Sequence, residues 1–127
     1  MIVVDASAAL TALLRRGEAR QMLAIEQLHA PHLVDSEVVN GLRRQAAAGQ
    51  VEAEAAKRIL AIWPRLALTR YPVFALMTRM WELRENLSAY DASYVALAET
   101  LGCSLLTADA RLARAPGVRC AVTVVPR

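Results

Sequence analysis

Short apolar runs alternate with longer two-faced segments along this chain. Residues 2–4 are apolar and β-branched throughout, which is typical of a strand buried on both faces of a parallel sheet. Further strands are predicted at 66–69, 104–106 and 121–125, with an extended piece around His29 and Ala30 that stops at Pro31. Helical spacing predicts helices at 8–14, 19–28, 36–48, 52–62, 73–83, 88–101 and 110–114, the third of them capped by Asp35 or Ser36.

This alternation predicts the α/β class. Parallel strands require crossover helices, so the elements are expected to form a three-layer α/β/α fold with a short parallel sheet flanked by helices. A length of 127 residues fits a single domain, residues 1–127. Ligands of such folds bind beyond the carboxyl ends of the strands, and the residues that follow the strands are therefore the first candidates for a functional site.

Composition narrows the class of protein. With 56% hydrophobic residues, 21% charged residues and a mean hydropathy of +0.29, the chain is not expected to be disordered, and it has apolar surface to spare for a partner. Cys103 and Cys120 lack metal-site spacing, and no basic leader precedes the first apolar run. We therefore expect a soluble, cytoplasmic protein without a membrane partner. The net charge of +3 comes mainly from arginine, which suits phosphate, although genome composition explains it as well.

The chain has four aspartates, and two of them closely follow apolar strand runs. Asp5 comes directly after residues 2–4, and Asp109 follows the run at 104–106. Taken alone, each would cap the next helix and favour its dipole. If the two strands are neighbours, both carboxylates project at the same sheet edge, and like charges that close persist only with a cation or a raised pKa.

Two further acids stand at predicted helix starts. Asp91 follows Ser88 by three residues, which matches the capping-box pattern S-x-x-[DE]. Glu37 lies in the first turn of its helix, with Asn40 one turn further on the same face. Capping alone explains each acid, but the four acids together would form an all-oxygen cluster. Hard oxygen ligands suit Mg²⁺ or Mn²⁺ far better than zinc or copper.

Other chemistries receive little support from the sequence. It has no glycine-rich phosphate loop, no Walker-type lysine and no G-x-S-x-G motif. His29 and His32 are separated by a proline and have no matching ligand pair, which favours solvent or capping roles over metal binding or acid–base chemistry. Trp63, Trp81 and the tyrosines fall on helical faces and are expected in the core or at an interface rather than as base-stacking platforms.

Four segments in order resemble the PIN-domain ribonucleases of the VapC toxin type. They are IVVDAS at 2–7, SEVVNGL at 36–42, LSAYDASYVALAE at 87–99 and LLTADARL at 105–112. Each segment alone is weak, but the ordered set in a chain of this length is specific, and the similarity runs nearly from end to end. The resemblance implies a PIN-like α/β/α fold.

The resemblance also implies a site, a reaction and partners. The catalytic residues would also hold one or two Mg²⁺ ions, with Mn²⁺ able to substitute: they are Asp5, Glu37, Asp91 and Asp109. Polar positions that orient water or substrate are matched by Ser7, Asn40 and Thr107. Members of the family cleave single-stranded or loop RNA (tRNA, rRNA or mRNA), act as homodimers and are neutralised by a VapB-type antitoxin whose tail reaches the active site. The additional acid that some PIN nucleases carry after the fourth one is absent here, which argues against a fully ligated second ion.

Two other functions stay open. An aspartate after the first strand also suits a Mg²⁺-dependent phosphatase, although Ser7 stands where a second aspartate is expected. In a catalytically silent PIN-like binding module, the four acids would only cap helices. Five arginines are candidates to hold flanking phosphates, although solvated helix faces are the favoured explanation: Arg15, Arg16, Arg43, Arg44 and Arg111. The helices at 19–28 and 52–62 are candidates for a clamp around an amphipathic partner segment.

Overall fold

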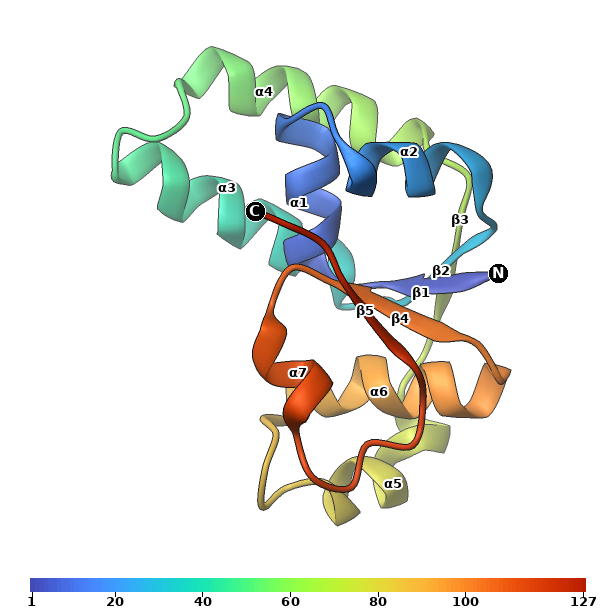
Figure 1. Cartoon of the computed structure of the whole chain (residues 1–127). Helices are drawn as coiled ribbons and strands as arrows, with labels where there is room; N and C mark the ends of the chain where they lie inside the picture. Colours follow the sequence, from blue (N-terminus) through green and yellow to red (C-terminus); the bar gives the residue numbers. More distant parts are fainter.

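The computed structural model describes residues 1–127 and contains one five-stranded sheet in which all neighbouring strands run parallel. The strands are β1 (Ile2–Val4), β2 (Leu28–Pro31), β3 (Leu68–Tyr71), β4 (Ser104–Thr107) and β5 (Val122–Val124). Their order is β3-β2-β1-β4-β5 (Figure 1). The chain moves outward from β1 through β2 and β3, then returns to the other side of β1 for β4 and β5. Such a reversal opens a crevice beyond the carboxyl ends of the two central strands, β1 and β4.

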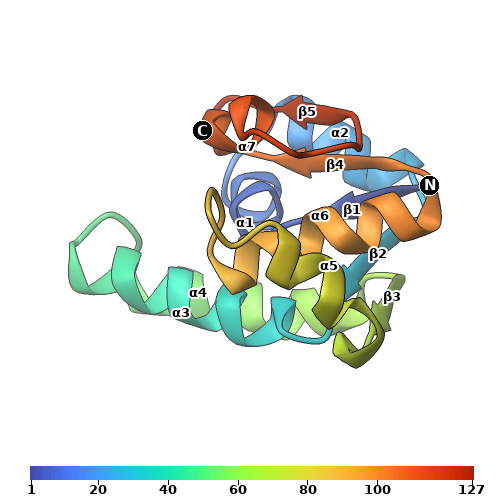
Figure 2. The same cartoon turned by 90° about the horizontal axis from the view of Figure 1, so that it is seen from below.

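Helices cover both faces of this sheet. They are α1 (Ala6–Leu14), α2 (Glu18–Ile25), α3 (Val34–Ala47), α4 (Ala53–Ile62), α5 (Met77–Glu82), α6 (Ala89–Leu101) and α7 (Ala110–Arg114), with 3₁₀ turns at Trp63–Arg65 and Phe74–Leu76. Helices α1 to α4 lie on one side and α5 to α7 on the other (Figure 1), which confirms the predicted three-layer fold. The α3–α4 hairpin projects beyond the carboxyl ends of the strands (Figure 2). None of the helices combines the length and the apolar character needed to cross a membrane.

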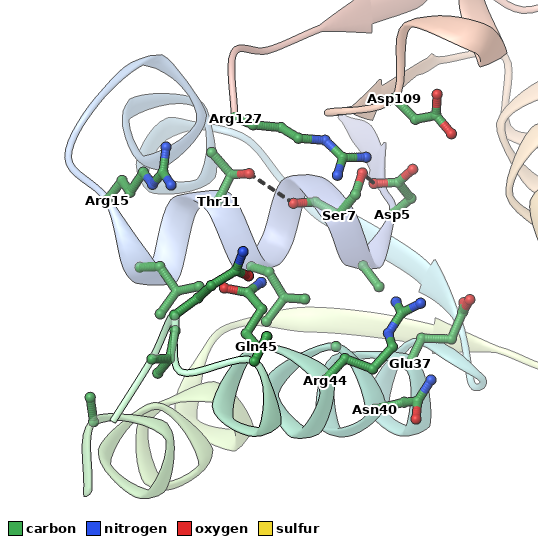
Figure 3. A pocket seen from close by; sticks show the side chains of 18 of the residues that line it. Asp5, Ser7, Thr11, Arg15, Glu37, Asn40, Arg44, Gln45, Asp109 and Arg127 are labelled. Atoms are coloured by element: carbon green, nitrogen blue, oxygen red, sulfur yellow. Dashed lines mark hydrogen bonds between the residues drawn. The ribbon is translucent and has the colours of Figure 1, made fainter. Parts of the chain in front are cut away.

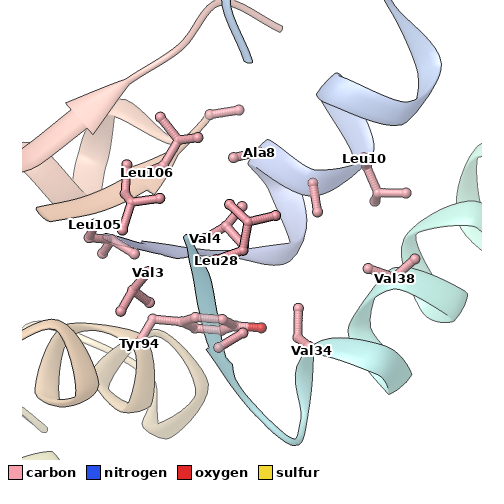
Figure 4. Packing of buried hydrophobic residues seen from close by; sticks show 14 of the residues in the cluster. Val3, Val4, Ala8, Leu10, Leu28, Val34, Val38, Tyr94, Leu105 and Leu106 are labelled. Carbon is pink, nitrogen blue, oxygen red and sulfur yellow. The ribbon is translucent and has the colours of Figure 1, made fainter. Parts of the chain in front are cut away.

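The core is centred on β1 and β4. Val3, Val4, Leu105 and Leu106 are fully buried, because helices cover these strands on both faces. Helix α6 is buried over the whole stretch 92–98, and the ring of its Tyr94 lies beneath β1 among the core residues (Figure 4). The strands are therefore enclosed along their length, and only the residues just beyond their carboxyl ends reach a solvent-accessible crevice.

Helices α1 and α3 pack closely because a glycine stands at their contact. A Cβ atom at Gly41 would lie 2.3 Å from Cδ1 of Leu10, so any side chain there would force Leu10 to move. This close approach keeps the first turn of α1, which follows Asp5, beside the first turns of α3, which carry Glu37. The packing of two helices thereby brings together two of the predicted site residues.

Most predicted elements are confirmed to within two residues at each end, and three of them are shortened, shifted or different in kind. The helix predicted at 19–28 ends at Ile25, because the chain must become extended for β2 to pair with β1. The third strand lies at Leu68–Tyr71 rather than at 66–69, since Leu66 still follows the 3₁₀ turn. The helix predicted at 73–83 is a 3₁₀ turn followed by the short helix α5.

The predicted cap of α3 is wrong. The N-cap residue is Leu33, which makes no side-chain capping bond, and neither Asp35 nor Ser36 caps the helix. Asp35 instead accepts a hydrogen bond from Trp63 Nε1 at 2.7 Å and receives the guanidinium of Arg70 at 2.7 and 2.8 Å. A two-pronged arginine pair stabilises a carboxylate more than a single amide does, so Asp35 ties α3 to β3 instead of capping its own helix.

Candidate active site

All four acids predicted for the site line one cavity at the carboxyl end of the sheet. The cavity has a volume of 1010 Å³. Its lining includes six of the seven predicted site residues, Asp5, Ser7, Glu37, Asn40, Asp91 and Asp109. The acids stand at or near the N-terminal ends of four helices, α1, α3, α6 and α7. Because each helix presents the positive end of its dipole there, the fold partly offsets the repulsion among the carboxylates.

Asp5 is the most enclosed of the four acids. It is 6% exposed and caps α1, accepting the amide of Ala8 at Oδ1 over 2.9 Å. The hydroxyls of Ser7 and Thr107 donate to its two oxygens at 2.7 and 2.5 Å. Burial raises the pKa of Asp5, and the charge of Asp91 acts in the same direction, while the three hydrogen bonds oppose both. Asp5 is therefore a rigidly held carboxylate that forms no ion pair with a cationic side chain.

Ser7 and Thr107 join the two strand ends to each other. Each hydroxyl donates its hydrogen to Asp5 and accepts a backbone amide of the turn after β4: Ser7 accepts Ala108 N–H at 2.9 Å and Thr107 accepts Asp109 N–H at 3.0 Å. A hydroxyl with its hydrogen engaged in this way is an orienting group for the carboxylate. Thr107, the seventh predicted site residue, is fully buried and acts on the cavity through Asp5.

Glu37 reaches the cavity from α3 and is held from below by α6. The phenol of Tyr94 donates to Glu37 Oε1 at 2.5 Å. Burial raises the pKa of Tyr94 far above its ordinary value, so this group remains a donor. Burial also raises the pKa of Glu37, with the charges of Asp91 and Asp5 adding to the effect. Asn40 lies one turn further along at the exposed rim, where its Oδ1 accepts two hydrogen bonds from Arg43.

Asp91 enters the cavity from the start of α6. The predicted capping motif is present, because Ser88 Oγ accepts the amide of Asp91 at 3.2 Å and Ser88 is the N-cap residue. The helix ends after Leu101, as its predicted range 88–101 has it, and Gly102 follows in the left-handed conformation with φ +65°. Burial and the charge of Asp109 raise the pKa of the Asp91 carboxyl group. The charge of Asp91 thus interacts with those of Asp5, Glu37 and Asp109.

Asp109 differs from the other three acids, because it is paired with an arginine. It caps α7 through the amide of Arg111 at 3.0 Å, and the guanidinium of Arg111 reaches its Oδ2 at 2.6 Å. This guanidinium holds the pKa of Asp109 below its ordinary value. In Figure 3 the Asp109 carboxylate lies at the far side of the cavity from Glu37.

The donor set fits a hard divalent cation in its chemistry, although its present geometry is not that of a finished metal site. Four carboxylates supply only oxygen ligands, and three of them have raised pKa values caused by burial and by one another's charge. No three acidic, histidine or cysteine side chains are arranged to hold an ion together. Two of the four carboxylates contact other side chains: Asp109 is turned to Arg111, and Glu37 accepts from Tyr94.

Two residues that line the cavity were not predicted from the sequence motifs. Tyr94 and Arg127 were not anticipated as lining residues, whereas Arg15 and Arg44 were among the phosphate candidates and do line the cavity. Tyr94 could have been found from its helical spacing, because it follows Asp91 by one turn. Nothing around Arg127 in the sequence marks it, since its position depends on how the segment after β5 runs.

Of the remaining predictions, the core position of Trp63 is confirmed, whereas the solvent or capping role expected of His29 is wrong, because His29 lies within β2 with its Nε2 buried. His29 Nδ1 lies 2.6 Å from the hydroxyl of Tyr71, away from the cavity. Trp63 is buried in the core, while Trp81 is 66% exposed and stacks against Arg84. Both cysteines are free thiols.

Comparison with known proteins identifies the family of the chain. A family model for the PIN domain matches residues 2–118. Ribonuclease VapC9 of Mycobacterium tuberculosis is 61% identical over 127 residues, covering 100% of both chains. Ribonuclease VapC1 of the same species is 42% identical over 128 residues, covering 97% of this chain and 96% of the relative.

Two crystal structures share the architecture. A protein from Pyrobaculum aerophilum matches with a TM-score of 0.68 and 29% identity, covering 95% of this chain and 81% of the other. VapBC2 from Rickettsia felis, bound to a DNA fragment from its promoter, matches with a TM-score of 0.67 over 98% and 99% of the chains, and at 14% identity it shows the fold alone. The chain belongs to the PIN-domain family. Within that family it is of the VapC ribonuclease type, which confirms the resemblance predicted from the four sequence segments.

Proposed function

We propose that this protein is a divalent-metal-dependent endoribonuclease that hydrolyses phosphodiester bonds in single-stranded or loop RNA. The observation that carries the proposal is the convergence of four carboxylates on one cavity, where three of their pKa values are raised by burial and mutual repulsion. Such a cluster is stabilised by a cation. The names of its relatives, ribonucleases VapC9 and VapC1, support RNA as the substrate.

The proposed ligands of Mg²⁺, or of Mn²⁺ in its place, are Asp5, Glu37, Asp91 and Asp109. An ion held there would polarise a water molecule for attack on phosphorus and neutralise charge on the leaving oxygen. Ser7 and Thr107 hold the Asp5 carboxylate in one orientation, and Tyr94 does the same for Glu37. Asn40, at the rim, is placed to orient the substrate. Asp109 becomes available as a ligand once Arg111 turns away.

The cavity favours a nuclease over the two alternatives. A phosphatase would need a second aspartate where this chain has Ser7. The Ser7 hydroxyl is hydrogen-bonded to Asp5 and to the amide of Ala108, so it supplies neither a second acid nor a nucleophile. If the protein were a catalytically silent binding module, the acids would only cap helices. Asp5 and Asp109 do cap α1 and α7. Capping does not require the Asp5 charge to be buried beside the charge of Asp91, which raises its pKa.

A VapB-type antitoxin is the proposed regulatory partner, and the protein is proposed to act in the cytoplasm as a homodimer. For the antitoxin, apolar side chains are exposed on the two helices predicted as a clamp: Ile25 at the end of α2 and Leu60 and Ile62 on α4. A second apolar group covers the α5 region on the other side of the sheet and would suit a copy of the chain: Phe74, Met77, Trp81 and Tyr90.

The proposal is tested by incubating purified protein with a structured RNA pool in Mg²⁺, Mn²⁺ or EDTA. Asp91→Asn, prepared identically, controls for contaminating ribonuclease. We expect metal-dependent cutting by the wild type and none by Asp91→Asn. Cutting that persists in the variant or in EDTA contradicts the proposal. Absence of cutting together with absence of Mn²⁺ binding at millimolar concentration favours the binding module instead.

A further inference from the structure

The carboxylate cavity is also lined by arginines, and none of these is engaged with an acid. Arg15, Arg44 and Arg127 share the cavity with the four carboxylates. The side-chain ion pairs of the molecule are formed by other arginines, Arg70, Arg79 and Arg111. A guanidinium group that lies in a negatively charged cavity without pairing with a carboxylate is available to a ligand of its own.

Arg44 and Arg127 are the two that lie next to the acids. Arg44 follows Glu37 by seven residues on α3, which is two helical turns and therefore the same face. Its positive charge opposes the rise in the pKa of Glu37 that burial causes. Figure 3 shows its guanidinium beside Glu37, pointing into the cavity.

Arg127 approaches from the opposite wall. Its Nε donates to the carbonyl of Ala108 at 3.3 Å, which anchors the side chain and leaves both terminal nitrogens without a protein partner. Figure 3 shows its guanidinium beside Ser7 and Asp5. After Arg111, the charge of Arg127 also contributes to the low pKa of Asp109.

An RNA strand bound in this cavity needs positively charged side chains beside the carboxylates. The four carboxylates repel every phosphate of the backbone, and cations held by them offset that repulsion only at the bond being cut. Phosphates on either side require separate positive charges, and the planar guanidinium fork matches two phosphate oxygens at once. Arg15, at the far end of α1, is about 15 Å along that helix from Asp5 and is not adjacent to the acids.

We infer that Arg44 and Arg127 grip the RNA backbone on the two sides of the cleaved phosphate, so that the strand crosses the cavity from the turn after β4 to α3. This inference rests on the proposed function, since it presumes an RNA substrate. The inference assigns RNA binding to two arginines that form no ion pair with a carboxylate. Arg111 is not included, because it is paired with Asp109.

The test measures binding of a fluorescently labelled single-stranded RNA to the full chain in EDTA, over a range of salt concentrations. We expect Arg44→Gln and Arg127→Gln each to reduce the slope of log affinity against log salt by about 0.7, which is about a fivefold loss of affinity at 0.1 M salt. With metal present, each should raise KM for cleavage more than it lowers kcat. Matched controls are Arg58→Gln and Arg65→Gln, which remove the same charge from exposed positions outside the cavity.

The outcomes separate this inference from the proposed function. If the wild type cuts RNA and the two variants match the controls in the salt slope of RNA affinity and in KM, Arg44 and Arg127 do not bind the RNA backbone. The proposed nuclease function is unaffected by that result. If the wild type neither binds nor cuts RNA, the proposed function fails and this inference fails with it. If RNA binding is unchanged but binding of a co-expressed antitoxin weakens, the arginines serve the protein partner and the inference is overturned. Equal melting temperatures establish that all variants fold.

Discussion

The two central strands end in aspartates that are held in opposite ways. Asp5, after β1, is 6% exposed, receives hydroxyl and amide donors and has a raised pKa. Asp109, after β4, lies at the start of a five-residue helix, is paired with the exposed Arg111 and has a lowered pKa. The first carboxylate is fixed in place without an ion pair, whereas the second is paired with an exposed arginine that can turn away.

This difference shows which part of the site the fold prepares in advance. The hydroxyls of Ser7 and Thr107 reach Asp5 from two different elements, so the carboxylate keeps its orientation without any bound ion. The pair between Asp109 and Arg111 is local and exposed, and such pairs contribute little to stability. We therefore expect Asp5 to define the metal position and Asp109 to be recruited to it.

The largest expected effect is that of Asp5→Asn. The change removes one buried charge while keeping the shape, so the protein should fold but lose at least about 100-fold in the rate of RNA cleavage, together with Mn²⁺ binding. Cleavage assays and titration calorimetry measure the two effects. Asp35→Asn is the matched control, because Asp35 lies outside the cavity and pairs with Arg70. It should lower stability and leave cleavage intact.

Asp109→Asn should have a smaller effect, which tests the comparison directly. If Asp109 is a recruited ligand, its loss should lower the cleavage rate by about tenfold, as is typical of groups that support a metal site rather than define it. The rate is measured under the same conditions as for Asp5→Asn. Equal losses in the two variants would show that both strand ends matter equally and that the asymmetry has no functional meaning.

How well the sequence predicts each site residue depends on how many residues separate it from its contact partner. Asp91 was placed correctly because its cap, Ser88, is three residues away, and a short-range motif determines local geometry. Asp35 was misplaced as a cap because its partners, Trp63 and Arg70, are 28 and 35 residues away.

The same limit applies to the cavity. That Asp5 and Asp109 meet was predictable from strands ending at one sheet edge, since parallel strands align their carboxyl ends. The contact between Tyr94 and Glu37 spans 57 residues and depends on α6 packing beneath the sheet opposite α3. The position of Arg127 likewise depends on the path of the chain after β5, for which the motifs carry no information.

A pH experiment follows from the raised pKa of Asp5. The ordinary value is 3.8, so between that value and the higher folded value the native state binds more protons than the unfolded state. The contribution of Asp5 to stability is thus present below pH 3.8 and is lost as the pH rises through the folded pKa. In EDTA, the melting temperature of the wild type should fall relative to that of Asp5→Asn as the pH rises through this window. Mn²⁺ should remove this difference in melting temperature. If the wild type instead loses stability relative to Asp5→Asn as the pH is lowered, the expected direction of the effect is wrong.

The smallest expected effect concerns Arg111, whose side chain is 81% exposed. Arg111→Gln leaves Asp109 without its cation, so Mn²⁺ should bind about threefold more tightly at low ionic strength, as measured by titration calorimetry. Because the pair is exposed, the gain should shrink as added salt screens it. Arg114→Gln, on the same short helix and without an acid partner, controls for the general loss of positive charge. If both variants gain equally, the effect is one of net charge and Asp109 is not held back by Arg111. If only Arg111→Gln gains, competition between the arginine and the ion for one carboxylate explains why the β4 end of the site is complete only when an ion is bound.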